Sequence, residues 1–128
     1  MQTSQELAAF VSDLAFERLP AAVIDKAQLC LTDSLGCLIA GQETAAGTAI
    51  REFIRLAGES GGVRVLGSDL RTSPGMAAFA HATLINALDF DDIYDKGHPG
   101  ATVIGAAVSL AQELDSTEAE LLLSLIHI

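Results

Sequence analysis

Two long segments without a charged side chain flank a short acidic segment, and this pattern limits what the chain can fold into. The uncharged segments run over residues 72–88 and 98–112, with histidine counted as neutral. The acidic segment, residues 86–100, holds four of the seventeen acidic residues and one of the three histidines. Long apolar segments must be buried, whereas the acids between them need water or a partner. We therefore expect a polar loop between two buried elements, and a functional site in that loop.

Apolar residues recur at helical spacing through most of the sequence. The predicted helices cover residues 4–16, after a Thr3–Glu6 capping box; 20–41, from Pro20 to Gly41; 45–57; 73–88; 101–114; and a sixth that follows a capping box at 115–118. Residues 63–67 alternate weakly and predict one short extended segment, which alone makes no sheet. The predicted fold class is all-α, an antiparallel helical bundle with short connections.

Polar and sulfur-containing residues interrupt the apolar face of the second predicted helix. Asp33 lies among apolar neighbours, so we expect it to be buried with a partner that fixes helix packing. Cys30 and Cys37 are separated by about 10 Å of helical rise. This distance is too long for a disulfide, so both are expected to be core thiols.

Composition and charge exclude several classes of partner. The 128 residues correspond to one small domain or part of one, with half of them apolar and a mean hydropathy of +0.40. A net charge of −10 with seven scattered cations argues against nucleic acid and anionic membranes. The longest uncharged segment contains Pro74, His81 and Asn86 and does not predict a membrane span. The N-terminus lacks signal-peptide features, so a cytoplasmic location is expected.

The acidic segment has a spacing that allows proton-transfer chemistry. If helix continues into it, Asp89 and Asp92 lie one turn apart on one face, whereas Asp91 and Asp95 turn toward another. His98 then precedes the next helix, whose free N–H groups favour an anion over an imidazolium. A carboxylate and a neutral imidazole near such a helix end can transfer protons. The competing interpretation is that the aspartates are solvated loop acids and that His98 caps the helix.

Several short motifs occur in a characteristic order. They are Leu19-Pro20 with Val23-Ile24, Asp33-Ser34-Leu35-Gly36 before Ala40-Gly41, Val65-Leu66-Gly67, Leu88-Asp89-Phe90-Asp91-Asp92 and His98-Pro99. This set resembles the MmgE/PrpD family over about residues 7–123. The family includes 2-methylcitrate dehydratase and cis-aconitate decarboxylase, which are homodimers that act on small polycarboxylates without a metal or an iron–sulfur cluster. The resemblance implies a lyase without cofactors, of which this chain is the first part of an all-helical N-terminal domain.

The resemblance also implies roles for individual residues. Asp89 and His98 fall on active-site positions, and Asp92, Ile93 and Lys96 are expected beside the substrate. Ile93 stands where some active relatives have Thr, which removes a hydroxyl from the expected pocket and favours a different substrate. A further departure is that relatives usually have Asn-Gly and then His before the acidic motif, where this chain has His81-Ala82 and Asn86.

The family chemistry requires an acid or a base beside a substrate carboxylate. His98 fits that role, and Asp89 is expected to orient a histidine or to hydrogen-bond the substrate, because a bare carboxylate repels an anion. Dehydration, decarboxylation and epimerisation remain open, since all pass through a carbanion-like state. Lysines that bind substrate carboxylates are expected beyond residue 128.

Two other interpretations use the same residues. Asp91-Asp92-Ile93-Tyr94-Asp95 fits the Asp-Asp-x-x-Asp motif of class I terpene synthases and prenyltransferases, which bind Mg²⁺ and diphosphate. A second metal motif and an arginine cluster are missing from the sequence, so we expect no metal site. The third interpretation is a non-catalytic helical interaction fragment.

Residues 123–128 resemble a translated sequencing-adapter read, so His127 is given no functional role.

Overall fold

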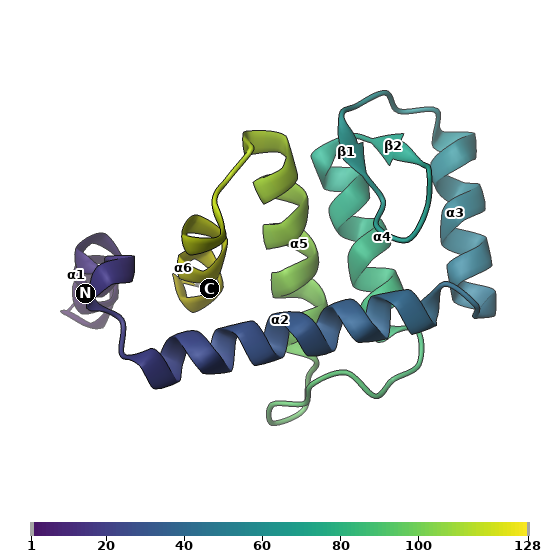
Figure 1. The fold of residues 1–128 in the computed structure, drawn as a ribbon. Coiled ribbons are helices and arrows are strands. Elements are labelled where there is room, and N and C mark those ends of the chain that lie inside the picture. Colours follow the sequence, from purple (N-terminus) through teal and green to yellow (C-terminus); the bar gives the residue numbers. More distant parts are fainter. Residues whose placement is uncertain (1, 128) are drawn as a thin grey trace.

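The computed structural model describes residues 2–127, which form six α-helices and one small β ladder (Figure 1). The elements are α1 (Gln2–Asp13), a 3-10 turn η1 (Phe16–Arg18), α2 (Ala21–Gly41), α3 (Ala45–Ala57), β1 (Val63–Arg64), β2 (Arg71–Thr72), α4 (Pro74–Asn86), α5 (Pro99–Leu114) and α6 (Glu118–His127). The predicted all-α class is confirmed. In Figure 1, α3, α4 and α5 stand side by side with alternating direction, and α2 crosses them at one end.

Local capping explains where the central helices begin. Thr44 accepts a hydrogen bond from the backbone N–H of Gly47 at the start of α3, and Ser73 accepts one from Met76 at the start of α4. Pro74 follows Ser73 in the first turn, where its missing N–H costs nothing. The predicted bounds of α3 are therefore correct, and α4 begins within one residue of its predicted start.

Other predicted boundaries are wrong by one to three residues. α1 begins at Gln2, so the predicted capping box at Thr3 lies inside the helix. Pro20 is the N-cap of α2 and not its first helical residue. The capping box of α6 uses Thr117 and Glu120, which bond to each other's backbone N–H groups at 2.7 and 3.3 Å. Several Ser, Thr and Asp residues compete for the cap there, and spacing alone selects the wrong one.

The core lies between α2, α3, α4 and α5, and α4 and α5 make the most extensive contact. Its buried members are Cys37, Leu38, Ile50, Ile54, Val65, Ala80, Leu84, Ile85, Ala101 and Ile104. Two glycines let backbones approach closely. A Cβ at Gly41 would lie 2.1 Å from the Leu84 carbonyl oxygen, and one at Gly105 would lie 2.9 Å from the Ala82 nitrogen. Gly41 thus sets the spacing of α4 from α2, and Gly105 sets its spacing from α5.

Two predictions about burial and pairing are corrected, and the prediction that the cysteines form no disulfide is confirmed. Asp33 is exposed, because α2 contacts the other helices along one side only and Asp33 lies on the outer side. Residues Val63 and Arg64 do have a partner strand, since they pair antiparallel with Thr72 and Arg71. The pairing partner carries no alternating pattern, so the sequence gives no sign of it. Both cysteines are free, with Cys37 buried and Cys30 partly buried.

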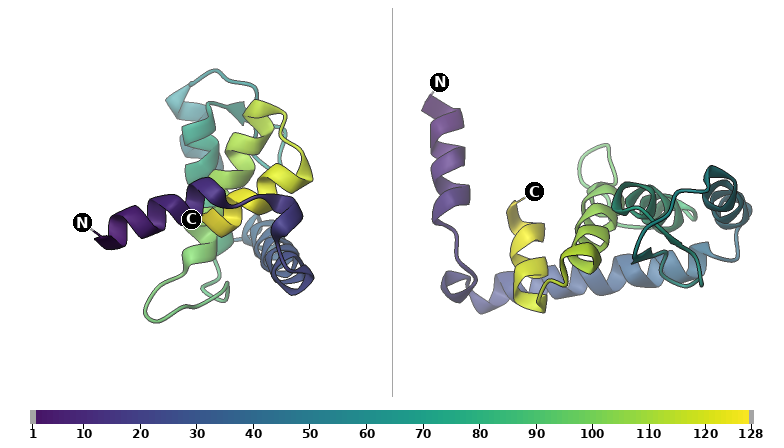
Figure 2. Two further views of the ribbon diagram at one scale, coloured as in Figure 1. Left: turned by 90° about the vertical axis from the view of Figure 1, so that its left-hand side faces the viewer. Right: turned by 90° about the horizontal axis from the view of Figure 1, so that it is seen from above.

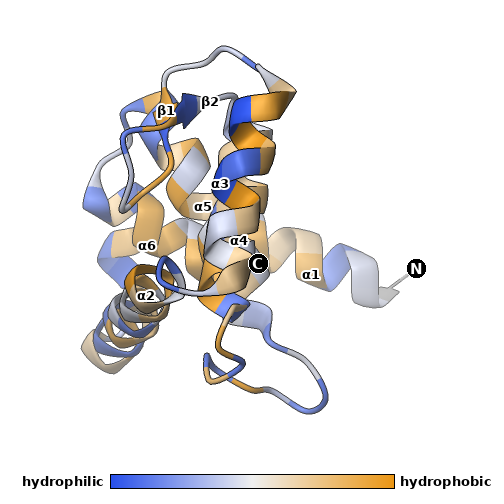
Figure 3. Cartoon of the chain, turned by 90° about the vertical axis from the view of Figure 1, so that its right-hand side faces the viewer, coloured by the Kyte–Doolittle hydropathy of each residue, from blue (hydrophilic) through white to orange (hydrophobic). Residues whose placement is uncertain are grey.

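The N-terminal helix differs most from its predicted packing. Leu7, Phe10 and Val11 recur at the spacing of a buried helix face, yet Leu7 is 61% exposed and the other two are also exposed. Figures 1 and 2 show α1 at the far end of α2, away from α3 and α4. Figure 3 shows apolar residues on this separate helix. Within the described residues, no helix is both long and apolar enough to cross a membrane.

A buried histidine joins the segment after β1 to α4 and α5. His81 is fully buried, and its Nε2 accepts a hydrogen bond from the backbone N–H of Leu66 at 2.9 Å. Nδ1 must therefore carry the ring proton, and it lies 2.8 Å from the hydroxyl oxygen of Ser109. That hydroxyl donates in turn to the carbonyl of Gly105 at 2.8 Å. Both ring nitrogens are satisfied inside the fold, so His81 is a structural residue.

Candidate active site

The acidic loop leaves helical geometry where α4 ends at Asn86. Asp89 and Asp95 both have φ of 56°, in the left-handed region that Asp tolerates better than most residues. Tyr94 and Gly97 exchange backbone hydrogen bonds in a tight turn. The expectation that Asp89 and Asp92 share one face of a continuing helix is therefore wrong. The loop instead extends past α2 and returns to the start of α5 (Figure 1).

His98 lies between two carboxylates of this loop. It occupies the N-cap position of α5, as its place before the helix predicted, and its side chain is 26% exposed. Nε2 lies 3.4 Å from Oδ1 of Asp89, and Nδ1 lies 3.2 Å from Oδ1 of Asp91. Each nitrogen of the imidazole therefore faces a different acid. The structure places Asp89 next to His98, and it adds Asp91 as a second acid beside the ring.

Asp91 is the buried member of the group. No part of its side chain is exposed, whereas the Asp89 side chain is 82% exposed. Asn86, the last residue of α4, donates from Nδ2 to Oδ1 of Asp91 at 3.1 Å. The expectation that Asp91 turns away from the site is wrong, because it assumed a continuing helix, whereas α4 ends at Asn86, five residues before Asp91. The sequence gives no signal for the burial of Asp91, which stands between Phe90 and Asp92.

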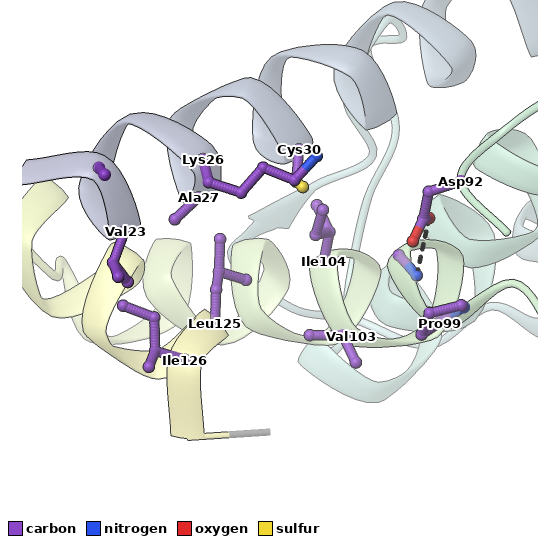
Figure 4. A pocket seen from close by; sticks show the side chains of 12 residues that line it. Val23, Lys26, Ala27, Cys30, Asp92, Pro99, Val103, Ile104, Leu125 and Ile126 are labelled. Carbon is purple, nitrogen blue, oxygen red and sulfur yellow. Dashed lines mark hydrogen bonds between the residues drawn. The ribbon is translucent and has the colours of Figure 1, made fainter. Parts of the chain in front are cut away.

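Asp92 has a structural role at the start of α5. Its Oδ1 accepts a hydrogen bond from the backbone N–H of Gly100 at 3.0 Å (Figure 4). A Cβ at Gly100 would lie 2.0 Å from the same oxygen, so a side chain there would displace the Asp92 carboxylate. His98, by contrast, makes no side-chain capping bond. The anion that we expected the free N–H groups of this helix end to favour is therefore, at Gly100, a carboxylate of the protein itself.

Replacing Asp92 tests this capping role. Asp92→Ala is expected to lower the free energy of unfolding by about 0.5–2 kcal/mol, because it removes a side-chain cap and leaves a helix N–H without its acceptor. Urea denaturation of this chain measures the change. Asp92→Asn is the matched control and should retain most of the stability, since Asn caps helices about as well as Asp. Equal stability of Asp92→Ala and the unmodified chain would contradict the capping role.

Two cavities border the start of α5, on opposite sides. A cavity of about 630 Å³ lies beside His98, with polar groups from Thr83, Asn86 and Thr102 among alanines. A second cavity of about 540 Å³ lies between α2, α5 and α6, with Asp92 at one end and mostly apolar walls (Figure 4). The predicted catalytic histidine and the predicted substrate ligand Asp92 therefore face different spaces.

The remaining predicted site residues lie on the surface of the loop. Asp89, Ile93 and Lys96 are exposed and line neither cavity. Lysine and arginine are absent from the described lining of the cavity beside His98. The described residues thus supply a proton-transfer group there, but no cation to bind a carboxylate substrate.

The three aspartates of the diphosphate motif do not converge on one point. Asp91 faces His98, Asp92 caps α5, and Asp95 is exposed in the turn. Between residues 2 and 127, no group of three or more His, Cys, Asp or Glu side chains is placed to hold a metal ion. The geometry of this part of the chain gives no support to the terpene synthase interpretation.

Comparison with known proteins identifies the family of this chain. The model of the MmgE/PrpD N-terminal domain matches residues 5–127. A probable 2-methylcitrate dehydratase from Saccharomyces cerevisiae is 32% identical over 95 residues, which cover 71% of this chain and 18% of the yeast protein. The chain thus spans less than a fifth of the length of this relative. No solved structure matches. Because the family match covers nearly the whole sequence, the chain belongs to the MmgE/PrpD family.

Proposed function

We propose that a longer protein containing this chain is a cofactor-independent lyase that acts on a small hydroxy-polycarboxylate, as a 2-methylcitrate dehydratase would. The observation that supports this proposal is His98, held between Asp89 and Asp91 beside a cavity of about 630 Å³. The name of the yeast relative supports the same class of reaction.

The residues present can perform part of a dehydration. The reaction needs a base for the proton next to a carboxylate, an acid for the leaving hydroxyl, and donors for the enolate-like charge. His98 is assigned the proton transfer, because both of its nitrogens have an acidic partner and the ring borders the cavity. Asp89 is assigned a supporting role at Nε2, from which a substrate can displace its exposed carboxylate.

The substrate carboxylates need cations that the cavity beside His98 does not contain in the described residues. We propose that these cations come from other parts of the longer protein, since this chain corresponds to only 18% of its yeast relative. Ile93 and Lys96 are exposed in the loop, and we propose that they contact substrate only when further polypeptide covers them. Asp92 acts indirectly, by fixing the start of α5.

A turnover assay tests the proposal at two levels. This chain alone is expected to show no turnover of 2-methylcitrate or cis-aconitate above a buffer blank, because the cationic part of the site is missing. The longer protein is expected to convert at least one hydroxy-polycarboxylate without added metal. Absence of turnover by the longer protein, when folded, would contradict the lyase proposal. Turnover by the chain alone would contradict the proposed contribution from elsewhere.

A further inference from the structure

We infer that Asp91, and not Asp89, is the positioning residue of His98. This inference rests on the proposed function, in which His98 transfers the proton. Two carboxylates approach the ring at similar distances, 3.2 Å for Asp91 and 3.4 Å for Asp89. Distance alone does not separate them, so the assignment depends on how firmly each carboxylate is held.

Asp91 is held by the fold, whereas Asp89 is not. The Asp91 side chain is completely buried, and Asn86 at the end of α4 donates to its Oδ1 at 3.1 Å. Asp89 is 82% exposed, so water screens its attraction to the imidazole and leaves it a weak constraint on the ring. A buried carboxylate anchored on a helix end fixes the ring orientation far better than a solvated one.

The buried polar atoms around His98 indicate the same pairing. Within the described residues, Oδ2 of Asp91 and Nδ1 of His98 are both buried without a hydrogen bond of good angle. Nδ1 nevertheless lies only 3.2 Å from Oδ1 of the same aspartate. Leaving a buried polar atom unpaired is unfavourable, so a small rotation that pairs the ring with Asp91 is favoured. Among residues 2–127, Asp91 is the only acid within ion-pair distance of Nδ1.

This pairing selects the nitrogen that works in catalysis. A proton on Nδ1, directed at Asp91, leaves the lone pair of neutral His98 on Nε2. Nε2 faces the exposed side, where Asp89 is the only carboxylate in contact with it among residues 2–127. The arrangement is that of a base oriented by a third group. Asp91 therefore acts through His98 and does not itself touch the substrate.

The tautomer of His98 tests the inference directly in this chain. Nitrogen chemical shifts of ¹⁵N-labelled histidine distinguish the two neutral forms, and His98→Gln identifies the signal among the three histidines. We expect the Nδ1–H form to predominate at a pH where the ring is neutral, although free imidazole side chains favour Nε2–H. Asp91→Ala should change the predominant form to Nε2–H. Asp91→Asn should retain Nδ1–H, because its amide oxygen still accepts beside Asn86.

Asp89→Ala is the matched control and should leave the tautomer unchanged. A predominant Nε2–H form in the unmodified chain would overturn the inference, and this measurement requires no variant to fold. An equal change in Asp89→Ala and Asp91→Ala would also overturn it. The spectra need no substrate. An Nδ1–H tautomer in a longer protein without lyase turnover would therefore contradict the proposed function and leave the positioning role of Asp91 intact.

Discussion

His98→Ala is expected to lower kcat of the longer protein by about 10²–10⁴-fold, with a smaller change in KM, because a proton-transfer residue acts in the transition state. The side chain borders the cavity and is contacted by Asp89 and Asp91, so its loss removes the only imidazole at this position. Steady-state kinetics with 2-methylcitrate, or with the best substrate found, measure both constants.

Asp95→Asn is the matched control for this variant. Asp95 lies in the same loop, is exposed, and has a left-handed backbone that Asn also adopts readily. The control should leave kcat nearly unchanged. If His98→Ala raises KM and leaves kcat as it was, His98 binds substrate and does not transfer a proton.

Acidification is expected to destabilise the fold through His81. Burial lowers the pKa of His81 below its usual value of 6.5, because the charged ring would lose its hydration. Protonation would also place an N–H on Nε2, directly against the N–H of Leu66. Below about pH 6.5 the unfolded chain binds this proton more readily than the folded chain. The contribution of His81 to stability is therefore complete above that pH and declines as the pH falls toward the folded-state pKa.

Urea denaturation between about pH 8 and pH 5 measures this effect. His81→Ala is expected to cost about 3–5 kcal/mol at neutral pH, because it opens a cavity and leaves the Leu66 N–H and the Ser109 hydroxyl without their partner. His81→Asn is the second variant, since it removes the titrating ring and keeps a polar side chain. Both should weaken the dependence of stability on pH in this window. If the pH dependence of stability is the same in both variants as in the unmodified chain, groups other than His81 cause it.

The parts of the fold that sequence predicts well are those fixed by neighbouring residues. Ser73 and Pro74 mark the start of α4 by local chemistry alone, and Gly41 coincides with the end of α2. The β ladder was missed because Arg71 and Thr72 carry no strand pattern of their own and become a strand only by pairing with Arg64 and Val63. Burial of Asp33 was predicted wrongly because helical periodicity does not reveal how many sides of a helix are covered.

In the candidate site, too, some features can be predicted from neighbouring residues and others cannot. Its position in the acidic loop and the place of His98 before α5 follow from the charge pattern and from Pro99. The roles of Asp91 and Asp92 do not, because both depend on the path of the backbone after Asn86. Asp92 reaches Gly100 eight residues later, a separation outside the usual capping patterns. The left-handed conformation of Asp89 is likewise invisible in a single sequence.

The close pairing of α4 and α5 has a consequence for the order of folding. These helices are consecutive, they make the most extensive contact in the molecule, and the acidic loop is their only connection. Closing a short loop costs little entropy, and local contacts form quickly. Asn86 and His98 stand at the two facing ends of this helical hairpin, so the geometry of the imidazole is set when the hairpin closes. Fraying of α1 or α6 would then leave the proton-transfer group in place.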